Sequence, residues 1–177
     1  MTGTFYNTER VHEKLSAKAS RRCRNAGSHL HLNGHLMTLP EPLYDEIVRL
    51  CEAGNSHCDN DDFEAALEAF RSAAALLPEP KTDWEAATWV YTAIGDALFF
   101  LDDYTQALEA LQIAVVSPDG LGNPFIHLRL GQCHYELGNH TQAADDLTRA
   151  YMSEGAEIFQ SDDPKYFEFL TTQIRLD

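Results

Sequence analysis

The sequence predicts an all-α protein made of repeated helix pairs. Three glycine–alanine–alanine triplets with the same spacing carry this prediction: Gly54–Ala66–Ala73, Gly95–Ala107–Ala114 and Gly131–Ala143–Ala150. A bulky apolar residue follows each first alanine by four positions, and these residues are Phe70, Leu111 and Leu147. Small residues in one register indicate that helix backbones approach closely there, with larger side chains packed around them.

Helical periodicity places the first pair. Apolar residues recur at steps of three and four from Leu43 to about Asn60. The partner helix is expected from Phe63 to Leu77, because the preceding Asp61-Asp62 carboxylates suit the positive end of a helix. Pro78 then ends it.

The second and third pairs follow the same plan. Asp83 is expected to cap a helix that runs to Leu101, and Asp102-Asp103 repeats the acidic turn before a helix over 104–116. After a loop over 118–124, helices are expected over 125–137 and 140–154. A last apolar segment over 162–176 is the natural cap for the terminal repeat. No strand pattern is found.

Charge divides the chain in two. Residues 1–36 hold six Lys/Arg and two Asp/Glu, whereas residues 37–177 hold seven Lys/Arg and 26 Asp/Glu, a net charge of −19. We interpret 1–36 as a basic, disordered leader and 37–177 as the folded domain; a basic arm with its own role is the alternative. The acidic domain disfavours nucleic acid and anionic membranes and favours basic protein partners. Solubility alone is the simpler explanation of the charge.

Neither cysteine usage nor apolar runs indicate export or membrane insertion. The four cysteines form no C-x-x-C pair, and Cys51 and Cys58 are too far apart on one helix to bridge. The chain is therefore predicted to be reduced and cytoplasmic. No apolar run is long enough for a membrane span, and no signal peptide is recognisable.

Candidate catalytic and metal-binding groups fail on spacing. His29-x-His31-x3-His35 has no accompanying carboxylate or cysteine ligands, and Asp59-Asn60-Asp61-Asp62 lacks the turn glycine and distal glutamate of a calcium loop. No Ser/His/Asp or Cys/His set is recognisable. We expect a non-enzyme without metal or cofactor.

The units around the three glycines resemble the tetratricopeptide repeat (TPR). They read Leu50-x2-Ala53-Gly54-x2-His57, Tyr91-x2-Ile94-Gly95-x2-Leu98 and His127-x2-Leu130-Gly131-x2-His134. The resemblance implies antiparallel helix pairs stacked as a right-handed superhelix. It places repeats at about 47–80, 88–121 and 124–157, with a capping helix at about 162–176.

The resemblance also implies a concave groove lined by the first helix of each pair. The groove residues it implies are Asn55, Asp59, Trp89, Thr92, Asp96, Phe99, Phe100, Phe125, Arg129, Gln132, Tyr135 and Glu136. Aromatic rings beside carboxylates suit a protein segment with apolar and Lys/Arg side chains. The co-chaperones of this family that clamp a terminal carboxylate need several groove cations. Arg129 is the only cation near the expected groove, which argues against that subtype.

The sequence leaves two main hypotheses about function and a third, more general one. The tail, with Arg149–Phe159 followed by Asp163–Leu170, is similar to bacterial TPR proteins of polymorphic-toxin loci, which implies an immunity protein that masks a basic toxin domain. The length, the acidity and the three repeats also resemble class II chaperones of type III secretion, which hold a translocator segment. A general TPR scaffold or regulator is the third reading. The oligomeric state stays open.

Overall fold

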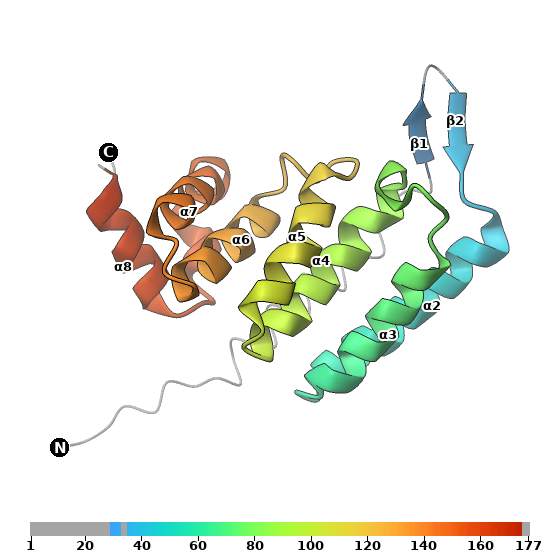
Figure 1. The fold of residues 1–177 in the computed structure, drawn as a ribbon, viewed down its shortest axis with the longest axis horizontal. Coiled ribbons are helices and arrows are strands. Elements are labelled where there is room, and N and C mark those ends of the chain that lie inside the picture. Colours follow the sequence, from blue (N-terminus) through green and yellow to red (C-terminus); the bar gives the residue numbers. More distant parts are fainter. Residues whose placement is uncertain (1–28, 33–34, 175–177) are drawn as a thin grey trace.

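The computed structural model describes residues 29–32 and 35–174. Its helices form three consecutive pairs, α2–α3, α4–α5 and α6–α7, and α8 follows at the C-terminal end (Figure 1). Each pair meets the next element mainly through its second helix, since α3 contacts α4, α5 contacts α6 and α7 contacts α8; α4 also contacts α6. The all-α solenoid predicted from the repeats is confirmed.

The helix bounds follow the predicted ones within a few residues. They are α2 Glu41–Cys58, α3 Phe63–Leu76, α4 Glu85–Phe100, α5 Tyr104–Val116, α6 Pro124–Glu136, α7 His140–Glu154 and α8 Pro164–Gln173. Two short 3-10 helices, η1 Lys81–Asp83 and η2 Gly155–Phe159, lie in the connections before α4 and after α7.

The repeated glycines mark the contact between the two helices of each pair. A Cβ atom on Gly95 would lie 2.5 Å from Cγ of Leu111, and one on Gly131 would lie 2.6 Å from Cγ of Leu147. Gly54 faces the ring of Phe70 in the same way. Each glycine thus admits the bulky residue of the partner helix that the sequence pattern pairs with it.

The turn inside each pair also repeats. Asp61, Asp102 and Gly138 occupy equivalent positions with left-handed backbone angles, φ 58°, 59° and 74°. A left-handed residue just beyond a helix ends it by turning the chain so that late carbonyls find donors. Glycine adopts this conformation without strain, and aspartate is among the few other residues that tolerate it.

The second aspartate of each acidic pair caps the following helix. The Asp62 carboxylate accepts the backbone N–H of Ala65 at 3.2 Å, and the Asp103 carboxylate accepts that of Gln106 at 3.1 Å. These contacts satisfy first-turn donors of α3 and α5. The predicted acidic turns before these two helices are confirmed.

The start of α4 differs from the prediction that Asp83 caps it. Asp83 lies in η1, and α4 begins at Glu85 after Trp84, which makes no side-chain cap. The indole N–H of Trp84 instead donates to the carbonyl of Pro78 at 2.9 Å. This bond ties the residue before α4 to the end of the preceding repeat.

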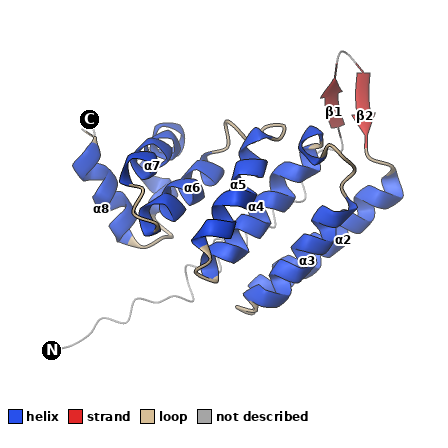
Figure 2. Cartoon of the chain, in the orientation of Figure 1, coloured by secondary structure: helices blue, strands red, loops and turns tan. Residues whose placement is uncertain are grey.

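The structure contains a hairpin that the sequence analysis did not predict. Strand β1 (His29–Leu32) pairs antiparallel with β2 (His35–Thr38), with His29 opposite Thr38 (Figure 2). The strands, His-Leu-His-Leu and His-Leu-Met-Thr, have four residues each and are too short to give a clear periodic signal. The statement that the chain has no strand pattern was therefore wrong. Residues 29–32, 35 and 36 of the predicted disordered leader belong to these strands. Residues 1–28 lie outside the described residues, and their disorder stays a prediction.

Buried apolar side chains form two clusters that meet at α6. One cluster extends from α2 to α6, and the other joins α6, α7, η2 and α8. Residues 126–133 of α6 are all buried, so this helix is covered all round in its central part. A polar residue on α6 must therefore find its partners inside the protein.

Candidate functional site

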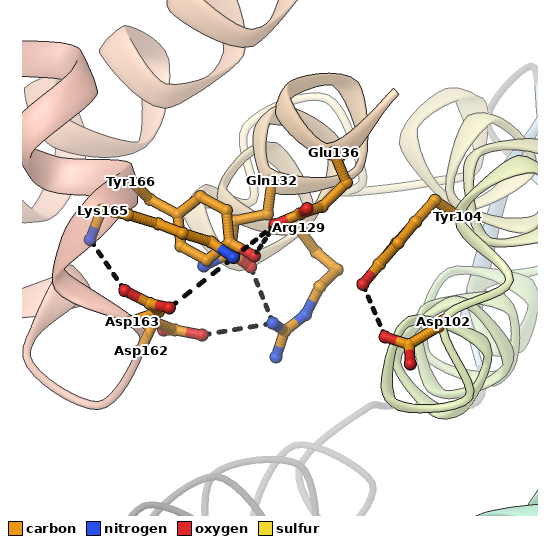
Figure 3. A network of polar contacts seen from close by, with 9 residues as sticks. All are labelled: Asp102, Tyr104, Arg129, Gln132, Glu136, Asp162, Asp163, Lys165 and Tyr166. Carbon is orange, nitrogen blue, oxygen red and sulfur yellow. Dashed lines mark hydrogen bonds and ion pairs between the residues drawn. The ribbon is translucent and has the colours of Figure 1, made fainter. Parts of the chain in front are cut away.

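Arg129, expected to line an open groove, is instead a buried cation between repeats. Its side chain is 0% exposed, and its guanidinium contacts Asp96 on α4 at 2.6 Å and Asp162 before α8 at 3.2 Å. It also donates to the side-chain oxygen of Gln132, one turn along α6, at 2.7 Å. Figure 3 shows this guanidinium between Gln132 and Asp162. Because it is enclosed, Arg129 is not available to a partner as a surface cation.

Three aromatic rings complete the surroundings of Arg129. The guanidinium carbon lies 4.3 Å from the ring centre of Phe99 and 5.3 Å from those of Phe100 and Phe125. Aromatic faces attract a cation, and more strongly where water is excluded. The structure thus brings five predicted groove residues together with Arg129: Asp96, Phe99, Phe100, Phe125 and Gln132.

The carboxylates keep this buried group charged. Burial acts to lower the pKa of Arg129, but the nearby carboxylates of Asp96 and Asp162 outweigh it and raise the pKa above its ordinary value. A buried ion pair contributes little net stability, because desolvation offsets the attraction, yet losing one partner is costly. The cluster therefore fixes how repeat 2, repeat 3 and the C-terminal segment fit together.

Glu136, another predicted groove residue, is held by the C-terminal segment. The ammonium of Lys165 lies 2.8 Å from its carboxylate, and the hydroxyl of Tyr166 donates to it at 2.6 Å (Figure 3). Burial and this hydrogen bond raise the pKa of Tyr166. Lys165 and Tyr166 of α8 thus occupy the Glu136 carboxylate of α6, which a bound protein segment could otherwise contact.

Tyr135 belongs to the same junction. Its ring lies 5.5 Å from that of Tyr166 and 5.1 Å from that of Phe169 in edge-on arrangements, and it also approaches the His140 ring at 5.7 Å. Such aromatic contacts add to apolar burial. The end of the predicted groove at repeat 3 is therefore occupied by α8.

The other predicted groove residues lie away from this cluster. Asn55 and Trp89 are both 8% exposed, and Asp59 is exposed at the end of α2. Thr92 donates its hydroxyl to the carbonyl of Thr88 within α4. The indole N–H of Trp89 has no hydrogen-bond partner among the described residues.

The sequence did not predict the polar contacts of the C-terminal segment. Asp162, Lys165 and Tyr166 were assigned to the capping segment, and the last two also to the tail that carries the resemblance to TPR proteins of polymorphic-toxin loci, but none was expected to contact Arg129 or Glu136 as observed. The one signal in the sequence is that charged residues flank the aromatic run of the cap. Their targets lie about 30 residues upstream, beyond any helical period.

The two cysteines nearest the cluster are not poised as nucleophiles. Burial, followed by the carboxylates of Asp96, Asp59 and Asp61, raises the pKa of Cys58 to about 12. Burial is also the main reason that the pKa of Cys133 rises to about 12. Thiols with such pKa values stay protonated near neutral pH, and the thiolate is the reactive form. Within the described ranges, no group of three or more His, Cys, Asp or Glu residues could hold a metal ion.

Comparison with known families agrees with this architecture. Residues 92–159 match the family model described as tetratricopeptide repeat. The match supports a TPR protein. It runs from α4 through η2, so the assignment of α2 and α3 as a further repeat rests on the Gly54–Phe70 contact that they share with the matched pairs.

TPR repeats indicate a protein–protein interaction module, and this fold is typically a non-enzymatic binding scaffold. No curated protein matches the chain. Among the helices of the described residues, none combines the length and apolarity that crossing a membrane requires.

Proposed function

We propose that this chain is a bacterial immunity protein, a TPR module that binds and masks a cognate basic toxin domain. The observation that carries the proposal is the net charge of −19 on residues 37–177. Such a surface attracts a basic protein at long range and accelerates association. Toxins that act on nucleic acids are often basic, and covering their active site or substrate path inhibits them without any chemistry by the inhibitor.

The burial pattern shifts the proposed contact surface from the groove centre to the turns. Asp96 and Glu136 are committed to internal ion pairs, so changing their charge disturbs the fold as well as any binding. Asp59, Asp62 and Asp102 are exposed at the turns that join the helices of the first two pairs. These carboxylates are the better candidates for long-range attraction.

The first test is affinity capture from the native cell at low and high salt, with mass spectrometry of the retained proteins. We expect one basic partner with a small C-terminal toxin-like domain, retained less at high salt because added ions screen the attraction. Failure to retain any basic protein at low salt counts against the immunity function.

Association kinetics with that partner then test the acidic turns. Asp59→Lys should slow association several-fold at low salt, since surface charges act mainly on the association rate. Glu154→Lys is the matched control, because it makes the same charge change on an exposed residue at the end of α7. Equal slowing by both variants would mean that only total charge matters.

The affinity capture also distinguishes the immunity function from the second hypothesis, a type III secretion chaperone. Retention of a secreted, apolar translocator would favour that reading. A short synthetic peptide of the client should then bind the chain. Retention of many unrelated proteins would favour a general scaffold.

A further inference from the structure

Asp162 uses only part of its hydrogen-bonding capacity. Its side chain is 6% exposed, and its Oδ1 atom accepts a hydrogen bond from Nη1 of Arg129 at 3.2 Å. Oδ2 is buried without a hydrogen-bond partner among the described residues. A buried carboxylate oxygen without a donor is costly and rare in native proteins. Asp162 therefore offers an acceptor position inside the cluster.

Charge indicates which kind of donor suits this position. Arg129 supplies one positive charge to two carboxylates, and its shorter contact, 2.6 Å against 3.2 Å, goes to Asp96. Arg129 therefore shares its single positive charge between the carboxylates of Asp96 and Asp162, in a setting where low polarity strengthens attraction. A water molecule would supply a hydrogen bond, whereas a cation would supply the bond and the charge.

The rings around the cluster indicate the chemistry of that cation. Phe99, Phe100 and Phe125 already surround the guanidinium of Arg129, and Phe100 also stacks on Phe63 with ring centres 4.8 Å apart. A planar guanidinium packs on aromatic faces and pairs with carboxylates in a fork, and it is more weakly hydrated than an ammonium. Arginine therefore suits this environment better than lysine.

We propose that Asp162 anchors the guanidinium of an arginine in a basic protein segment bound at the margin of this cluster. This inference rests on the proposed function in one respect, since it assumes a basic protein partner. The anchor lies beside Asp96 and near Glu136, whose side chains are 18% and 19% exposed, so solvent reaches the margin of the cluster.

The test uses the full chain with fluorescein-labelled nona-arginine and nona-lysine, measured by fluorescence anisotropy at low salt. The parent should bind nona-arginine more tightly than nona-lysine. Asp162→Asn should weaken nona-arginine binding by about tenfold to a hundredfold and remove this preference, because a hydrogen bond to a charged group contributes about 1.5–3 kcal/mol. The asparagine carbonyl can still accept from Arg129, which favours retention of the fold.

Asp163→Asn is the matched control. Asp163 is the next residue, it is exposed, and its carboxylate caps α8 through the N–H of Lys165 at 2.9 Å. Asparagine caps a helix about as well as aspartate, so this variant loses the same charge without losing the cap. Its nona-arginine affinity should stay within about twofold of the parent, because the lost charge is exposed and screened. Equal losses in both variants, or no loss in Asp162→Asn, would overturn the proposal.

A second source of arginine lies within the chain, since residues 1–28 contain six Lys/Arg. Replacing Arg21, Arg22 and Arg24 by glutamine separates this source from a partner. Tighter nona-arginine binding in that variant means that the chain's own arginines compete for Asp162, and unchanged binding means that the site serves a partner. The peptide test is independent of the capture experiment: Asp162-dependent binding without a captured basic protein would reject the immunity function and keep the arginine site.

Discussion

The glycine contacts between paired helices give a quantitative test of how the repeats are built. In Gly95→Ala the new methyl carbon would lie 2.5 Å from Cγ and 2.8 Å from Cδ2 of Leu111. Apolar carbons pack best at about 3.5–4.0 Å, so α4 and α5 must separate or Leu111 must leave its rotamer. Overpacking of this kind costs about 1–3 kcal/mol. Alanine recovers about 1 kcal/mol through its helix propensity.

The expected net effect of Gly95→Ala is a loss of up to about 2 kcal/mol in the free energy of unfolding. Urea unfolding followed by circular dichroism measures it, with the midpoint falling and the slope unchanged. Gly122→Ala is the control, because a Cβ there meets nothing within 4 Å. Its stability should change by less than about 0.5 kcal/mol.

A double-mutant cycle identifies the cause. Leu111→Ala alone should cost about 2–5 kcal/mol through lost burial and a cavity. In that background Gly95→Ala no longer meets Cγ or Cδ2, so it should become neutral or stabilising by up to about 1 kcal/mol. If Gly95→Ala has the same effect with and without Leu111, the close-contact explanation of the repeat is refuted.

Three further predictions concern the cluster and the turns. Arg129→Met should lower the free energy of unfolding by about 3–5 kcal/mol, because it leaves the carboxylates of Asp96 and Asp162 without their cation. A loss below about 1 kcal/mol in urea unfolding would contradict the buried ion pair. Tyr166 is hydrogen-bonded to Glu136 and has a raised pKa in the folded state, so its stabilisation is present below its ordinary value of 10.0 and is lost as pH rises above it. Unfolding measured at pH 8 and 11 should show a steeper loss for the parent than for Tyr166→Phe, and parallel losses would contradict this. Gly138→Ala should cost about 1 kcal/mol in thermal unfolding through its φ of 74° alone, since no atom blocks a Cβ there, and an unchanged midpoint would exclude backbone strain.

The sequence was sufficient for features that repeat locally. The spacing from Gly95 to Leu111 recurs in all three pairs, and a recurring pattern of small and large residues directly reports which helix surfaces touch. The acidic turns were equally readable, because a cap acts within a few residues of its own position. Helix bounds therefore came out close to the observed ones.

The burial and the contacts of the predicted groove residues could not be predicted from the sequence in the same way. Whether Arg129 faces solvent or is buried depends on Asp162, which lies 33 residues away in a segment with no repeat partner. The family resemblance supplies an average position for Arg129 and Glu136, but the C-terminal segment that contacts them lies outside the repeats. Long-range pairing of single charged residues leaves no periodic trace in a sequence.

The enclosure of α6 has a consequence for how the molecule opens. A solenoid whose repeats touch only their neighbours can fray one unit at a time from an end. Here the eight consecutive buried residues 126–133 lie between both apolar clusters, and Arg129 links this helix to α4 and to the C-terminal segment. Amide hydrogens of α6 can exchange with solvent only when both sides separate. The two halves of the protein are therefore joined into one cooperative unit, with α6 as its slowest-exchanging element.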